Sequence, residues 1–550
     1  MVNLILLANI LACAGAMGGF ICGAIRFFRP RVSIYALMIG RNSYPPGKEK
    51  QMKTRTIRLL AAVLLAAMCL AALAGCGSAP ADPAETSEPS APDGKASETQ
   101  PADKPSETET EVFPDIEKMD YDYDITVLHY YVSDTWSPWE EIAVDTMTGD
   151  ILTDDIFDRN RWLQEEYNIR VHNTNCAHNE LKQKIDAQIQ TGGDDFQMLD
   201  TFGFGSGKLM GQFYFQNMRS IPTIDFNNPW WNQDILKAYS IAGYVEFAAS
   251  DMLLLDKGAT SLMVFNQELA DELGITDPYQ QVRDGDWTIE ALTVDMAQGC
   301  SELNGDAVMN GEDQWGLACG DDLSLALYVS SGSRFIQTDE EGFFYYSFLE
   351  EDSLDIMMDI FEQVMLSQNF FNSYINRGTV CPSFNDGQVL FTYGMAKSTK
   401  SLRALDMVYG LVPVPKYDDL QEEYVSWVNA WHDSMFAIMS TAPEPDTIGA
   451  ALELLGYYSF YRIRSDLYDN VICGRGTRNA ESIEMLNILF ANRVYDMGIS
   501  FDSANSFADH VQRNTATGSS SFASLIASHQ NDLEKHIADL NDLVFLYAED

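Results

Sequence analysis

The chain has 550 residues, of which 81 are acidic and 35 basic, and its formal net charge is −46. A surface this acidic repels phosphate backbones and anionic headgroups, which argues against nucleic-acid binding. The folded body, from about residue 125 to residue 550, is longer than one hydrophobic core covers, so we expect at least two lobes.

The N-terminal part contains an apolar run from Leu59 to Gly75 that follows several basic residues and ends in Leu-Ala-Gly-Cys, residues 73–76. This order resembles the signal peptide and lipobox of bacterial lipoprotein precursors, which are lipidated and cut at the cysteine. A transmembrane helix is the alternative, but the run is short for a bilayer and no basic stop-transfer residues follow it. We therefore expect residues 52–76 to be a lipoprotein signal peptide. Cys76 would then carry a lipid anchor on the extracellular face of the cell membrane.

Residues 1–51 contain a second apolar stretch, which ends near Ile25 and is followed by several arginines. This segment is either a membrane helix or a non-native extension, with synthesis beginning at Met52. We favour the extension, because a lipoprotein signal acts from the N-terminus and a leading helix would be redundant.

Residues 77–112 consist mainly of Ala, Pro, Ser, Thr, Glu and Asp. Such a segment cannot bury enough apolar surface to offset the entropy of ordering it, so we expect a disordered acidic linker. The linker would let the body stand clear of the membrane.

The body opens with short apolar runs that alternate with amphipathic stretches. They predict strand Asp124–Val132, helix Ile156–Tyr167, strand Ile169–Thr174, helix Asn179–Thr191 and strand Phe196–Leu199. This β-α-β-α-β order is typical of an α/β protein with a mostly parallel sheet. Later helices are expected over Ser353–Leu366, Ile448–Tyr461, Ala480–Val494 and Ser524–Tyr547.

Several segments together resemble one family, the extracellular solute-binding proteins that deliver ligands to ABC importers, in particular the carbohydrate-type branch that includes maltose-binding protein. They are, in chain order, Ser261–Gly274 (SLMVFNQELADELG), Asp286–Thr288 (DWT), Phe384–Tyr393 (FNDGQVLFTY), Val408–Pro415 (VYGLVPVP) and Glu481–Gly498 (ESIEMLNILFANRVYDMG). Two departures concern the structural part of these motifs: Gln267 stands where the family usually has Lys, and Val389 and Leu390 replace smaller residues.

The resemblance implies an α/β, two-lobed periplasmic-binding-protein-like fold of type II, with a hinge and a ligand cleft between the lobes. Lobe 1 would comprise residues 113–255 and 435–480, and lobe 2 residues 256–434 and 481–550. The protein would be a monomer without enzymatic activity. It would capture a small solute, a sugar or oligosaccharide, by closure of the cleft and deliver it to ABC transporter permease subunits.

Ligand residues in such a fold are expected in loops at the carboxyl ends of strands. Aromatic rings there can stack on a sugar, and Asp can accept hydrogen bonds from its hydroxyls. The candidates are Asp134, Trp136, Asp200, Phe202, Tyr393, Trp427 and Trp431. The alternative for each aromatic residue is a place in the core, which is the role we expect for Trp230, Trp231 and Trp287.

An acidic loop in the body has the spacing of a calcium-binding loop. The residues at positions 1, 3, 5, 7 and 12 are Glu302, Asn304, Asp306, Val308 (through its carbonyl) and Asp313. Ala307 stands where such loops have Gly, and an Asn-Gly-rich surface turn explains the segment equally well. If Ca²⁺ binds here, its role is structural, and no other cofactor is expected.

Three functional alternatives remain at this point. One is a lipid-anchored glycoside hydrolase, whose paired carboxylates cannot be identified from spacing in so acidic a chain. The others are binding proteins for peptides or for cationic solutes. The body lacks G-x-S-x-G, HExxH and P-loop motifs, which removes the enzyme classes that depend on them.

Overall fold

A computed structural model describes residues 111–131, 133, 137–374, 382–402, 404–472, 480–501, 506–516 and 522–548. All of them belong to one unit, Ser97–Asp550. The expected N-terminal extension, signal peptide and anchor at Cys76 lie outside the described residues, as do Asp134, Trp136 and nearly all of the acidic linker.

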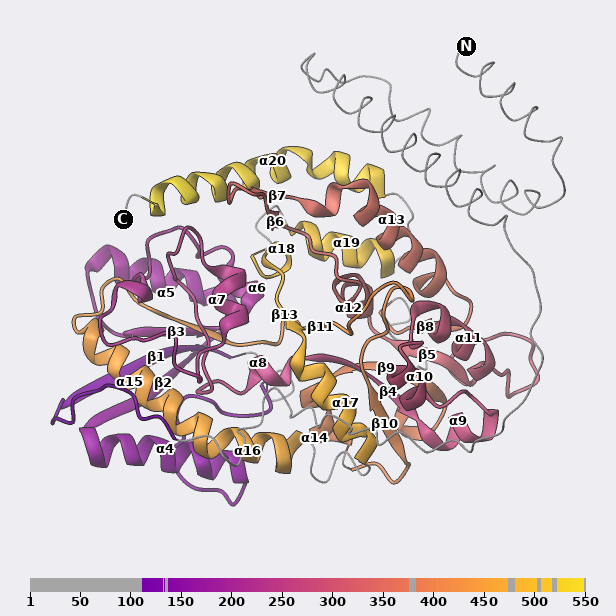
Figure 1. Ribbon diagram of the computed structural model, residues 1–550, viewed down its shortest axis with the longest axis horizontal. Helices are drawn as coiled ribbons and strands as arrows, with labels where there is room; N and C mark the ends of the chain where they lie inside the picture. Colours follow the sequence, from indigo (N-terminus) through magenta and orange to yellow (C-terminus); the bar gives the residue numbers. More distant parts are fainter. Residues whose placement is uncertain are drawn as a thin grey trace, which may run out of the picture. The chain divides into compact units, whose positions relative to one another are not determined.

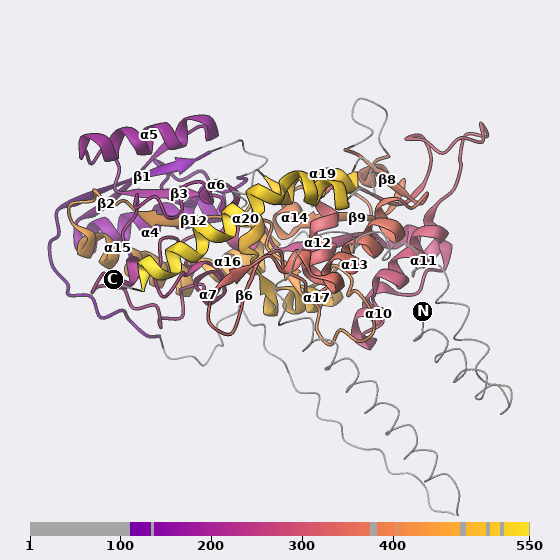
Figure 2. The same cartoon turned by 90° about the horizontal axis from the view of Figure 1, so that it is seen from above.

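The first sheet is built from the predicted β-α-β-α-β segment. It has the strand order β12-β3-β1-β2, with β1 (Tyr123–Tyr130), β2 (Ile169–Cys176), β3 (Met198–Thr201) and β12 (Met435–Ile438). Strand β1 is parallel to β2 and β3, whereas β12 is antiparallel to β3. Helices α4 (Ile151–Tyr167) and α5 (His178–Thr191) connect the parallel strands and lie on opposite faces of the sheet (Figures 1 and 2).

The second sheet has the order β10-β4-β9-β5-β8. Its strands are β4 (Ser261–Asn266), β5 (Trp315–Cys319), β8 (Phe370–Asn372), β9 (Val389–Met395) and β10 (Tyr409–Val412). Strand β5 is parallel to β8 and β9, and β4 is antiparallel to both of its neighbours. The two sheets thus share one pattern, in which a single strand runs against the others.

These antiparallel strands mark the places where the chain passes between the lobes. Strand β4 is the first strand of the second sheet and follows β3 of the first, while β12 rejoins the first sheet after β10 of the second. A third passage includes β13 (Arg493–Val494), which pairs with β11 (Ser426–Trp427). The expected α/β fold of two lobes crossed more than once by the chain is confirmed.

Buried charges hold the passage that leads into β4. Lys257 Nζ lies 2.9 Å from Asp251 Oδ1 and 3.2 Å from Asp256 Oδ1. Arg493, in the third passage, places Nη1 3.7 Å from Asp256 Oδ2. Because all four side chains are at least nine-tenths buried, removing any one partner would leave a charge without compensation.

The remaining helices cover the two sheets and the passages between them (Figure 1). They are α6 (Gly203–Ser206), α7 (Gln233–Tyr239), α8 (Leu255–Gly258), α9 (Gln267–Leu273), α10 (Pro278–Asp284), α11 (Ile289–Gly299), α12 (Asp322–Ser330), α13 (Glu351–Ile360), α14 (Thr399–Leu402), α15 (Pro445–Tyr458), α16 (Arg464–Asp466), α17 (Ala480–Ala491), α18 (Met497–Ser500), α19 (Phe507–Ala516) and α20 (Phe522–Tyr547). A small hairpin of β6 (Gln337–Thr338) and β7 (Phe344–Tyr345) precedes α13. In the described part of the chain, no helix combines the length and apolar character that crossing a membrane requires.

The observed elements match the sequence predictions in kind and differ at their ends. Helix α4 begins at Ile151 rather than Ile156, because the Asp150 side chain accepts the backbone N–H of Thr153 and caps the helix there. The helix expected to reach Val494 ends at Ala491, and the last residues of that segment form β13.

The tryptophans expected in the core are indeed buried. The indole N–H groups of Trp230 and Trp231 both donate to the carboxylate of Glu453 on α15, each at 2.9 Å. Trp287 donates to the backbone carbonyl of Pro413 at 2.7 Å.

Helix α20, the last element of the chain, contacts both lobes. Asn541 exchanges two hydrogen bonds with the backbone of Phe344 in the β6–β7 hairpin, at 2.7 and 3.1 Å. Near its end, Tyr547 donates to Glu246 Oε1 at 2.9 Å and stacks on Tyr244 with ring centroids 4.0 Å apart. The helix therefore joins the segment after β3 to the hairpin after β5 (Figures 1 and 2).

Candidate functional site

Residues from the ends of β1 and β3 meet the turn that leads into β12. Asp200 lies in β3, Phe202 is the first residue after this strand, and both side chains are buried. The Phe202 ring packs against Tyr130, the last residue of β1, at 4.9 Å between centroids. The backbone N–H of Gly203 donates to Asp433 Oδ1 at 2.7 Å, which fixes the turn against the end of β3.

Aromatic rings gather on the same turn. Trp431 is half-buried and stacks on Phe204, with centroids 4.8 Å apart and an interplanar angle of 25°. Trp427, in β11, is fully buried and meets Trp431 edge-on at 6.1 Å. The structure thus brings Trp431 to an accessible position, whereas Trp427 supports it from the interior.

The second sheet contributes Tyr393, which lies within β9, two residues before its end, and not directly after a strand as expected. Its hydroxyl lies 2.8 Å from Ser261 Oγ on the neighbouring strand β4. Asn429, in the turn before β12, donates to Asp322 Oδ2 at 3.2 Å. Burial raises the pKa of Asp322 to about 6, and the charge of Asp321 adds to this effect.

Buried carboxylates dominate the electrostatics of this region. Glu141 Oε2 accepts the backbone N–H groups of Leu254 and Leu255 at 2.5 and 3.1 Å and the hydroxyl of Ser434 at 3.0 Å. No described residue donates a hydrogen bond to the buried oxygens Glu141 Oε1, Asp200 Oδ1 and Asp433 Oδ2. Three unpaired carboxyl oxygens thus lie in one region, and each costs about 1–3 kcal/mol while it has no hydrogen-bond partner.

Burial shifts the pKa values of the neighbouring side chains. It raises the pKa of Glu141 to about 8, with a further contribution from the charge of Asp200. It lowers the pKa of Lys397 to about 7, although nearby carboxylates oppose the shift. His432, whose Nδ1 lies 2.9 Å from Lys397 Nζ, has a pKa lowered to about 3 by burial and by that lysine. Glu141 and Lys397, whose pKa values lie near neutrality, therefore change charge when a ligand alters their solvation, whereas His432 stays neutral.

The sequence predicted five of these residues, Asp200, Phe202, Tyr393, Trp427 and Trp431, but not several of the polar side chains that lie beside them. His129 and Lys397 lie at or just beyond the carboxyl ends of β1 and β9, so the rule that selected Asp200 could have found them. Glu141 and Asp433 lie in irregular segments and carry no such signal.

The acidic loop of residues 302–313 is closed by hydrogen bonds to its own backbone. Glu302 Oε1 accepts three N–H groups, and Asp306 Oδ1 accepts the N–H of Val308 at 2.7 Å. The buried Asp313 accepts the N–H groups of Leu303 and Asn310, each at 2.8 Å. Ala307 adopts a positive φ of 62°, where calcium loops have Gly.

The loop therefore forms the turn that we gave as the alternative to metal binding. Within the described residues, no group of three His, Cys, Asp or Glu side chains has the geometry to hold a metal ion. The Ca²⁺ site at residues 302–313 stays a prediction, and unfolding temperatures measured with Ca²⁺ and with a chelator would test it.

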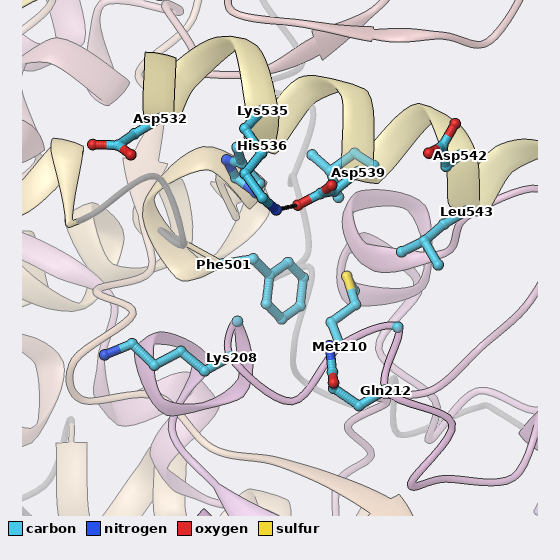
Figure 3. A pocket seen from close by; sticks show the side chains of 13 residues that line it. Lys208, Met210, Gln212, Phe501, Asp532, Lys535, His536, Asp539, Asp542 and Leu543 are labelled. Atoms are coloured by element: carbon cyan, nitrogen blue, oxygen red, sulfur yellow. Dashed lines mark hydrogen bonds and ion pairs between the residues drawn. The ribbon is translucent and has the colours of Figure 1, made fainter. Parts of the chain in front are cut away.

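A cavity of about 540 Å³ lies apart from these residues, beneath α20. Figure 3 shows Lys535, His536 and Asp539 of α20 on one side, with Phe501 and Met210 facing them. His536 Nδ1 lies 2.5 Å from the hydroxyl of Tyr346, and burial lowers the His536 pKa to about 4. None of the predicted ligand residues among the described ones lines this cavity.

Comparison with known proteins gives similarity only at the level of solved structures. No protein-family model and no curated protein matches the chain. An ABC substrate-binding protein from Listeria monocytogenes in complex with cycloalternan is 12% identical, with a TM-score of 0.49 over 76% of this chain and 98% of that one. The cyclic alpha-maltosyl-1,6-maltose binding protein from Arthrobacter globiformis is also 12% identical, with a TM-score of 0.49 over 76% and 99%.

Proposed function

We propose that this chain is an extracellular solute-binding protein that captures a sugar or oligosaccharide between its lobes and delivers it to the permease subunits of an ABC transporter. The protein is anchored to the cell membrane through a lipid on Cys76, acts as a monomer and has no enzymatic activity. One observation carries the proposal. Side chains near strand ends of the first sheet and from β9 of the second approach the same turn, where buried carboxyl oxygens lack hydrogen-bond partners among the described residues.

A polyhydroxylated ligand matches the chemistry of this region. Its hydroxyl groups, which both donate and accept hydrogen bonds, can pair with the oxygens of Asp200, Asp433 and Glu141 that are unpaired in the structure. The stacked pair of Trp431 and Phe204 offers an aromatic face of the kind that packs on a sugar ring. The acidic surroundings disfavour an anionic ligand.

Cleft closure follows from the topology. Because the site draws residues from both sheets and the chain passes between them several times, a ligand gains all its contacts only when the lobes meet around it. Binding then shifts the population toward the closed form, which is the form that the transporter would recognise.

Thermal unfolding of the purified protein with neutral oligosaccharides, peptides and polyamines tests the proposal. A ligand present at a hundredfold its dissociation constant should stabilise the fold by about 2.7 kcal/mol. We expect this for an oligosaccharide and expect the shift to shrink in Trp431→Ala, with Trp162→Ala as a control away from the site. Stabilisation by peptides or polyamines alone would contradict a sugar ligand, and release of shorter sugars would identify a hydrolase instead.

The anchor needs a separate measurement. Mass spectrometry of the mature protein should find a diacylglyceryl-modified Cys76 at the N-terminus. Retention of residues 1–51 would contradict this part of the proposal.

A further inference from the structure

A second cavity, of about 550 Å³, lies where α7, the β6–β7 hairpin and β13 meet. Its charged lining residues are Lys237, Arg334, Arg493 and Asp234. Three of these four residues are cations, in a chain whose net charge is −46, and Asp256 behind Arg493 and Asp496 beside Arg334 balance part of their charge. The cavity therefore attracts negative charge, whereas most of the surface repels it.

The two arginines are held in place by contacts with the protein. Arg334 Nη1 donates to the backbone carbonyls of Val329 and Ser333 at 3.0 and 2.7 Å. Arg493 lies 3.7 Å from Asp256, and its guanidinium sits over the ring of Phe490 at 5.7 Å from the centroid. Guanidinium groups oriented in advance lose little entropy when an anion binds.

Burial leaves the charge of Arg334 poorly solvated. It lowers the pKa of the guanidinium, and the nearby charge of Asp496 only partly opposes the shift. An anion in the cavity would supply the opposite charge close to this poorly hydrated cation, so its attraction to Arg334 is stronger than to a fully exposed cation.

The rest of the lining combines apolar residues with uncharged polar ones such as Ser240, Gln337 and Thr338. Ile336, Phe344 and Met497 contribute to the walls, and the volume lies within the range of small-molecule sites, about 300–1,000 Å³. A small inorganic ion would make no contact with these apolar side chains. We propose that the cavity binds a small organic anion, whose carboxylate or phosphate contacts Arg334 and Lys237 and whose apolar part packs on Ile336 and Phe344.

This site is distinct from the sugar site, and occupancy of the two should be coupled. Helix α7 follows β3 of the first lobe, while the β6–β7 hairpin follows β5 of the second, so a bound anion touches both. An anion that favours one arrangement of the lobes changes sugar affinity, and the sugar changes anion affinity by the same factor. Only this coupling rests on the proposed function; anion binding does not.

Thermal unfolding of the full chain at constant ionic strength tests the inference. Benzoate and phenyl phosphate serve as carboxylate and phosphate probes, and benzyl alcohol as the neutral control. We expect one or both anions to raise the unfolding temperature and the alcohol to leave it unchanged. No shift with either anion, or an equal shift with the alcohol, would overturn the proposal.

Two variants locate the binding. Lys237→Gln and Arg334→Gln should each lower the affinity for the anion by about tenfold or more, since a charge-assisted hydrogen bond is lost. Lys208→Gln, at the cavity beneath α20, removes an equal charge elsewhere and should bind as the wild type does. Lys237 is exposed, so its variant remains informative if Arg334→Gln fails to fold. Unchanged binding in Lys237→Gln and in a folded Arg334→Gln would refute the site.

Discussion

His129 and Asp200 occupy directly paired positions on β1 and β3, and His129 Nδ1 lies 2.5 Å from Asp200 Oδ2. Both side chains are buried. Although burial alone would lower the pKa of His129, the hydrogen bond and charge of Asp200 outweigh it and raise the value above the ordinary 6.5. The imidazolium form is thus favoured by the fold.

Asp200→Asn should make the stability of the protein less dependent on pH. The stabilisation from a raised histidine pKa is fully present below about pH 6.5 and is lost as the pH rises through the folded value. The free energy of unfolding of the wild type should therefore exceed that of the variant most near pH 6, and the difference should shrink toward pH 9. Chemical denaturation across this range measures it, and a difference independent of pH would contradict the assignment.

Buried and half-buried carboxyl groups should make the protein more stable in mildly acidic solution than at pH 8. Burial is the main cause of the raised pKa values of Glu141, Asp155 and Asp496, which are about 8, 7 and 6. Each group stabilises the fold below its ordinary pKa and loses that contribution as the pH rises through the folded value. We expect a higher unfolding temperature at pH 5 than at pH 8.

Asp155→Asn should flatten this profile, because Asp155 can no longer acquire a charge beside Asp466. The exposed Asp271→Asn serves as the control and should follow the wild type. Equal stability of the wild type at both pH values would contradict the prediction.

Replacement of Glu453 should destabilise the protein strongly. Its carboxylate accepts the indole N–H groups of Trp230 and Trp231, the side-chain amide of Asn228 and the backbone N–H of Asp225. Glu453→Ala leaves these donors without their acceptor and should cost about 3 kcal/mol or more in the free energy of unfolding. Glu453→Gln keeps one acceptor oxygen and should lose less. Urea denaturation would compare the two, and equal losses would argue against the hydrogen bonds as the cause.

Gly316→Ala should prevent normal packing of the second sheet. A Cβ atom at this position in β5 would lie 2.0 Å from the backbone oxygen of Met296 in α11, so helix and strand would have to separate. The matched control is Gly320→Ala, just beyond the strand, where a Cβ meets no atom within 4 Å. We expect a large fall in unfolding temperature for the first variant alone. Similar behaviour of the two variants would contradict the close approach of α11 to β5.

The sequence was sufficient for the elements and the fold class because hydrophobic periodicity is local. The strand before Asp200 and the helix ending at Tyr167 follow from a few neighbouring residues. The start of α4 was missed because capping by Asp150 depends on one side-chain hydrogen bond. The end of the helix at Ala491 was missed because β13 forms only by pairing with the distant β11.

The site was harder to predict because it depends on contacts between residues that are distant in the sequence. Asp200 and Phe202 could be selected from their place at a strand end. Glu141 could not, since its role depends on the backbone of Leu254 and Leu255, more than a hundred residues away. Trp427 and Trp431 are close in sequence, yet only the folded chain distinguishes the fully buried ring from the half-buried one.

The strand order of the first sheet also constrains how the chain folds as it is synthesised. Strand β12 covers the edge of β3, but it begins at Met435, after about four-fifths of the chain has been made. Until then β3 is an open edge that could pair with another molecule. The first sheet is therefore completed only after the strands of the second sheet from β4 to β10 have been synthesised. A chain that ends before β12 should aggregate rather than accumulate as a folded first lobe.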